Sequence, residues 1–130
     1  MVITLEQYWM GRDKKYPDAW SEDIEHQAID LLDRVNALLK GFGEDRSVNS
    51  GWRPPALNAA TNGAALKSKH MTGNAVDLAD PEGDLDDWCS ENDGALLSSY
   101  GLWMEHPAAT KGWCHLQNLP PKSGRRIFYP

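Results

Sequence analysis

The sequence has little of several features that mark specialised classes of protein. Only two of its 130 residues are cysteines, Cys89 and Cys114, which is too few for a disulfide framework, and we expect both to be free thiols. No run of about 18 apolar residues is present to cross a bilayer, so we expect no membrane span. The N-terminal stretch lacks the basic-then-apolar layout of a secretory signal, so we expect no signal peptide.

Positive charge is also scarce. The chain has 13 Lys and Arg against 19 Asp and Glu, for a net charge of -6. The basic residues are scattered, apart from the pairs Lys14–Lys15 and Arg125–Arg126. Binding to nucleic acid needs clustered Lys and Arg to neutralise phosphates. The sequence therefore indicates no nucleic-acid partner.

The length suits a single domain with one modest core, which we place at residues 1–130. The clearest element is a helix that starts at Ser21, a good N-cap followed by two acidic residues. Its apolar positions recur at helical spacing, so one face should pack on a core. Gly41 is the predicted C-terminal stop.

The remainder of the chain predicts short elements. Helices are expected first along the chain, and short, mainly antiparallel strands are expected after them. This order indicates a small α+β domain with its sheet packed against helices. In order we expect a strand ending at Pro54, a short helix and loop over 55–67, a strand at 74–79, mixed helix and turn over 82–101, strands at 102–106 and 112–117, and an edge strand in 125–130.

An aspartate interrupts the apolar run "AVDLAD", where a buried strand is expected. A charge in such a run is costly unless a partner or a metal ion compensates it. Strand alternation puts Asp77 on one face of its strand and His115 on the non-core face of another. If these faces line one cleft, His70 can join them. Two imidazoles and a carboxylate form a normal catalytic zinc set, although Fe, Co or Ni also accept such ligands, and a hydrogen-bonded His–Asp pair is the simpler alternative.

Residues 68–77, "SKHMTGNAVD", fit the pattern S-x-H-x-x-G-x-A-x-D, and residues 113–115 supply a later W-x-H. The chain resembles the zinc D-alanyl-D-alanine carboxypeptidases and dipeptidases and the phage L-alanyl-D-glutamate endopeptidases. The resemblance covers roughly residues 47–117 and a preceding helix. It implies the hedgehog-like metallopeptidase fold that these enzymes share.

The resemblance also implies roles for individual residues. It makes His70, Asp77 and His115 the ligands of a Zn²⁺ cofactor. Ser68 would support the loop before the first ligand and lie at the substrate site. Arg53, in "SGWRPP", would contact the substrate and polarise the scissile carbonyl, because a guanidinium can hold an oxygen in fixed geometry. Without the resemblance, Arg53 would be interpreted as an ordinary surface residue.

The chain departs from the family pattern at the general base. Most members carry an acidic residue three positions before the last His, where this chain has Gly112. The nearest candidate is Glu105, on the strand that a hairpin would bring beside His115. Glu105 could instead be a structural acid that orients a ligand histidine. Trp113 shares the ligand face and is a candidate wall of the substrate cleft, whereas we expect a core role for Trp52.

Taken together, the resemblance implies a zinc peptidase that cuts the stem peptide of bacterial peptidoglycan at the D-Ala-D-Ala or the L-Ala-D-Glu bond. We expect a phage-encoded monomer that acts on the cell wall after release, as a lysis enzyme, or as part of the virion. The alternative is a zinc-binding module without catalytic activity, with a structural or wall-binding role in a phage particle. Gly112 is the residue that favours this alternative.

Overall fold

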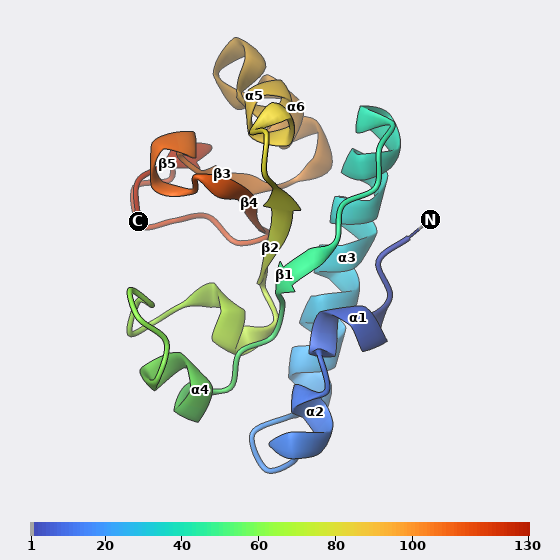
Figure 1. Cartoon of the computed structure of the whole chain (residues 1–130), viewed down its shortest axis with the longest axis vertical. Coiled ribbons are helices and arrows are strands. Elements are labelled where there is room, and N and C mark those ends of the chain that lie inside the picture. The colour runs from blue at the N-terminus through green and yellow to red at the C-terminus, as the bar shows by residue number, and fades with distance from the viewer. Residues whose placement is uncertain (1) are drawn as a thin grey trace.

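Five strands pair into one sheet in the computed structural model, which describes residues 2–130 (Figure 1). Their order across the sheet is β1 (Val48–Ser50), β2 (Ala75–Asp80), β4 (Gly112–Gln117), β3 (Trp103–Glu105) and β5 (Ile127–Phe128). Neighbouring strands are antiparallel except β3 and β5, which are parallel. The α+β class and the C-terminal edge strand are thus confirmed. The parallel pairing arises because the chain reverses after β4 and therefore runs in the direction of β3.

The long helix α3 (Glu22–Phe42) packs on the sheet and supplies much of the core. Ser21 caps it as predicted, since its Oγ accepts a hydrogen bond from the Ile24 amide at 3.3 Å. The predicted stop at Gly41 is wrong. The helix continues to Phe42 because the left-handed residue that ends it is Gly43, with φ of 90°, whose N–H donates to the Leu39 carbonyl.

Two short helices before α3 were not predicted, α1 (Leu5–Trp9) and α2 (Arg12–Lys15). A capping box between Thr4 and Gln7 starts the first one. The fully buried Tyr8 hydroxyl donates a hydrogen bond of 2.8 Å to the Ala75 carbonyl at the start of β2. Trp9 packs edge-on against Trp52, which is fully buried in the core as expected. These helices therefore fasten the N-terminal segment to the sheet.

The other elements are single turns or short helices near the ends of the strands, with α4 and the pair α5–α6 at opposite ends of the view in Figure 1. The first predicted strand ends at Ser50 rather than Pro54, because beyond it the Arg53 amide donates to the His70 carbonyl instead of pairing with β2. The remaining helices are α4 (Pro55–Ala59), η1 (Lys69–Thr72), α5 (Asp84–Ser90), η2 (Glu91–Gly94), α6 (Ala95–Tyr100) and η3 (Pro107–Ala109). None of the helices between residues 2 and 130 is long and apolar enough to cross a membrane.

The two central strands have one apolar and one polar face, as strand alternation predicted. Val76 and Leu78 of β2 and the corresponding residues of β4, Cys114 and Leu116, are fully buried in the core. Asp77 pairs with His115 across the strands on the opposite face. Both cysteines are buried and free, which confirms that prediction.

A second buried polar cluster lies where β2 leads into α5. Asp80, fully buried, accepts hydrogen bonds from the amides of Leu85 and Asp86 and so caps the helix. Asp86 accepts a hydrogen bond from the Thr110 hydroxyl at 3.0 Å. Burial raises the pKa of Asp86 to about 6, and the charge of Asp80 adds to this rise, against the lowering effect of hydrogen bonds from Cys114 and Thr110.

Asp86 should therefore make the protein less stable as the pH rises. Its pKa is higher in the folded chain than the value near 3.9 of an unfolded one, so the folded state binds the proton more tightly. The stabilisation is complete below about pH 4 and is lost by about pH 6. Thermal unfolding of Asp86→Asn, whose side chain stays neutral, should lack this decline. Asp18→Asn, at an exposed position whose charge does not act on Asp86, should keep the wild-type profile, and equal slopes in all three proteins would contradict the assignment.

Candidate metal centre

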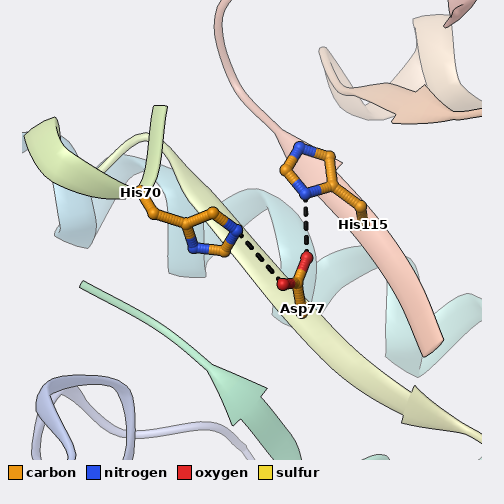
Figure 2. A group of neighbouring side chains, drawn as sticks. All are labelled: His70, Asp77 and His115. Atoms are coloured by element: carbon orange, nitrogen blue, oxygen red, sulfur yellow. Dashed lines mark hydrogen bonds and ion pairs between the residues drawn. The ribbon is translucent and has the colours of Figure 1, made fainter. Parts of the chain in front are cut away.

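Three side chains predicted as metal ligands converge on the polar face of the sheet. His70 comes from η1, Asp77 from β2 and His115 from β4, and Figure 2 shows both imidazole rings directed at the one carboxylate. One ligand atom of each residue lies within 4.8 Å of the others. The pairing of β2 with β4 and the turn at η1 therefore bring together residues that lie far apart in the sequence.

Local backbone structure holds His70 in place. Gly73 ends η1 with φ of 79°, and a Cβ at this position would lie 2.7 Å from the Ile24 carbonyl oxygen. A residue with a side chain would therefore be strained and would collide with α3. The Ser68 hydroxyl accepts a hydrogen bond from the His70 amide at 3.2 Å, so it supports the turn that presents the imidazole.

The partners of His70 determine which of its ring nitrogens faces the site. Nδ1 lies 2.9 Å from the Gly51 carbonyl oxygen, which can only accept, so Nδ1 carries the proton. Nε2 then presents its lone pair to Asp77 Oδ2, 3.2 Å away. Two acceptors at this distance need a cation between them, either a proton or a metal ion. The donor set therefore fits a metal.

His115 contacts the other oxygen of the same carboxylate, with 2.8 Å between its Nδ1 and Asp77 Oδ1. Burial tends to raise the pKa of Asp77, but hydrogen bonds with His115 and His70 and their charges hold it well below its usual range. Burial lowers the pKa of His115, but the hydrogen bond and charge of Asp77 outweigh burial, and the net effect raises it. Asp77 is thus ionised at neutral pH.

Arg53 lies beside this cluster and is held in a fixed orientation. Its Nε donates to Asn58 Oδ1 at 3.0 Å and its Nη2 to the Ser68 hydroxyl at 3.2 Å. Asn58, which is buried, is itself tied to the Ala65 carbonyl. Nothing in the sequence pointed to Asn58, because its contacts join a short helix to a loop and follow no periodicity.

Glu105 also lies at the cluster. Its Oε2 is 3.8 Å from His115 Nδ1 and accepts no hydrogen bond from the described part of the chain. Gly112, by contrast, is exposed, has a φ of 97° and has open space where a Cβ would be. A left-handed φ disfavours any residue with a side chain, so the usual position of the family's acid is poorly suited to one here.

Two other histidines stay outside the site. His106 caps η3 through its Nδ1, which accepts a hydrogen bond from the Ala108 amide, and its ring stacks on Tyr129 with 4.4 Å between centroids. His26 is exposed on α3.

A cavity of about 330 Å³ opens over the cluster. All the residues that the sequence singled out for metal, substrate or proton transfer line it: Arg53, Ser68, His70, Asp77, Glu105, Trp113 and His115. Lys67, on the loop before η1, and Lys69, the first residue of η1, lie on the same cavity. A pocket with convergent polar groups of this kind is suited to binding a substrate.

The family model described as Peptidase M15 matches residues 11–106. This range includes Arg53, His70, Asp77 and Glu105 and ends before His115. No curated protein and no solved structure matches the chain. Because the match spans well over half of the sequence, the chain belongs to the peptidase M15 family.

Proposed function

We propose that this chain is a zinc peptidase that hydrolyses the stem peptide of bacterial peptidoglycan, at the D-Ala-D-Ala or the L-Ala-D-Glu bond. The observation that carries the proposal is the convergence of His70, Asp77 and His115 beside Arg53 and Glu105 on one cavity, in a member of a peptidase family. Each group needed for hydrolysis of a peptide bond has a candidate within this set.

His70 Nε2, Asp77 and His115 would hold the zinc ion. Two histidines and one carboxylate leave a fourth position open, as in catalytic rather than structural zinc sites. When bound, zinc lowers the pKa of a water ligand to about 7 and so supplies a nucleophile at neutral pH. The hydrogen bond from His70 Nδ1 to the Gly51 carbonyl keeps the opposite nitrogen available for this ion.

Glu105 is the proposed general base. Its Oε2 faces His115 without accepting a hydrogen bond within the described residues, so this oxygen is available to take a proton from a water in the cavity. The same carboxyl group can then donate the proton to the leaving amine. Asp77 is less suited to this work, because both of its oxygens face histidines.

Arg53 is the proposed electrophilic partner of the substrate carbonyl. Asn58 and Ser68 occupy its Nε and one proton of Nη2, which fixes the plane of the guanidinium and leaves other N–H groups for substrate. A pre-oriented donor stabilises a developing oxyanion without reorganising during the reaction. Trp113, half-buried on the cavity, would form a wall beside the scissile bond.

The alternative is a zinc-binding module without catalytic activity, with a structural or wall-binding role in a phage particle. Gly112, in place of the usual acid, favours it. For either function we propose a phage-encoded monomer that meets the cell wall after release or as part of the virion. Hydrolysis of purified peptidoglycan, lost with a chelator and restored by zinc, would distinguish the enzyme from the module.

We expect one zinc ion per chain, which His70→Ala, Asp77→Ala and His115→Ala should each remove. His26→Ala, on the exposed face of α3, should keep it. Protons and zinc compete for His115, whose pKa is raised, so the apparent affinity should fall by about tenfold per pH unit once the pH drops below that pKa. Metal analysis and chelator competition across pH measure both effects. Full occupancy in His115→Ala would mean that this ligand is misassigned.

Arg53→Lys should keep zinc and lose most of the turnover. An ammonium is a point charge and cannot reproduce the two fixed contacts to Asn58 and Ser68 while also reaching a carbonyl. Steady-state kinetics on a stem peptide, with zinc content measured on the same sample, provide the test. Unchanged kinetics would return Arg53 to a structural role.

Glu105→Gln should keep the fold and the zinc ion, because the replacement retains size and shape. Hydrolysis should fall by about 10²–10⁴-fold, the usual contribution of general acid–base assistance. Single-turnover rates at saturating zinc measure this loss directly. Normal rates would place the base elsewhere, whereas weaker zinc binding at an unchanged rate per metal would identify Glu105 as a support for His115.

A further inference from the structure

Gln117, at the end of β4, lies between the His115 ring and the turn that follows the strand. The residue is 3% exposed and borders the cavity. Its Nε2 donates a hydrogen bond to the Leu119 carbonyl at 2.7 Å, and its Oε1 lies 2.8 Å from His115 Nε2. The family match ends before this segment, and the role of Gln117 in the site is unassigned.

The direction of these hydrogen bonds follows from the Leu119 carbonyl. A backbone carbonyl oxygen can only accept, so the amide nitrogen of Gln117 must face it. The amide oxygen of Gln117 therefore faces His115, and because this oxygen also only accepts, His115 Nε2 must carry a proton. In the neutral ring the lone pair is then on Nδ1, which lies 2.8 Å from Asp77 Oδ1 and faces the cluster.

The two histidines consequently present different nitrogens to the same point. His70 presents Nε2, because the Gly51 carbonyl holds its Nδ1 proton. His115 presents Nδ1, because Gln117 holds its Nε2 proton. A backbone group fixes the first ring, whereas a side chain fixes the second. The second arrangement can therefore be tested by substitution.

We propose that Gln117 is a positioning residue for the metal site. Its hydrogen bond to the Leu119 carbonyl orients the amide group, and the amide oxygen then fixes the tautomer and the orientation of His115. This inference rests on the proposed zinc site. A neutral imidazole can place its proton on either nitrogen, and the tautomer with Nδ1–H cannot ligate from the side that faces Asp77. Loss of such a supporting hydrogen bond costs about 10–100-fold in metal affinity.

Two substitutions separate the hydrogen bond from the bulk of the side chain. Gln117→Met keeps length and fills the same space without an acceptor, so its zinc affinity should fall by about 10–100-fold in competition with a chromophoric chelator. Gln117→Glu keeps an oxygen opposite His115 Nε2 but cannot donate to the Leu119 carbonyl, so it should bind zinc more tightly than Gln117→Met and less tightly than the wild type. Gln27→Met makes the same chemical change at a half-buried position on α3 and should bind zinc as the wild type does.

A spectroscopic measurement tests the tautomer itself. In zinc-loaded wild-type protein labelled with ¹⁵N, the ring of His115 should show a slowly exchanging proton on Nε2 and a metal-shifted Nδ1. Gln117→Met should lose the protection of that proton. This measurement on the wild type decides the inference even where Gln117→Met does not fold, because a proton on Nδ1 and a metal-shifted Nε2 would overturn it.

The outcomes also separate this inference from the proposed function. A wild-type chain that binds no zinc would overturn the proposed function and the inference with it. Wild-type zinc binding, together with a folded Gln117→Met that binds within twofold of it and keeps the protected Nε2 proton, would overturn the role of Gln117 alone. Weaker peptide binding by Gln117→Met at unchanged zinc affinity would likewise overturn it, since Gln117 would then contact the substrate instead.

Discussion

The register between β2 and β4 is the constraint on which the rest of the site depends. It places Asp77 opposite His115 and, on the other face, Leu78 opposite Cys114 in the core. Because side chains alternate along a strand, a slip of one residue would move Asp77 into the core and an apolar neighbour to the cavity. The cost of burying an unpaired carboxylate opposes such a slip. The same pairing therefore builds the core and assembles the metal-binding face.

Polar groups are distributed unevenly along β2. Near its start, the Tyr8 hydroxyl donates a hydrogen bond to the Ala75 carbonyl, and His70 Nε2 and His115 Nδ1 face the Asp77 carboxylate. At its end, Asp80 caps α5 with both carboxylate oxygens. One strand thus carries one carboxylate opposed by histidines, which suits a cation, and another stabilised by helix amides and by Arg46, whose Nε lies 3.9 Å from Asp80 Oδ1. These environments explain why two aspartates three residues apart have different roles.

Much of this arrangement was predictable from the sequence. Periodicity identified α3 and the polar faces of β2 and β4, and the spacing of the S-x-H-x-x-G-x-A-x-D pattern indicated the family. Periodicity could not reveal α1 and α2, which are too short for a helical pattern, nor the end of α3, where two glycines two residues apart compete. The contact of Asn58 with Arg53 spans only five residues but follows no helical or strand periodicity. The contact of the Gly51 carbonyl with His70 depends on how segments 19 residues apart pack, so no local pattern encodes it.

The order of the strands explains how a base could be supplied without an acid at position 112. Because β4 lies between β2 and β3, His115 has a carboxylate on each side, with its Nδ1 2.8 Å from Asp77 and 3.8 Å from Glu105. Position 112 begins β4 in a left-handed conformation that favours glycine, whereas Glu105 is the last residue of β3 and follows Met104, the last residue of that strand paired with β4. The two carboxylates also differ in chemistry. Asp77 is engaged by both histidines and stays ionised, whereas Glu105 keeps an oxygen that accepts no hydrogen bond within residues 2–130. Of the two, only Glu105 can take up a proton without breaking the contacts that gather the ligands, which is why the neighbouring strand suits the proposed base.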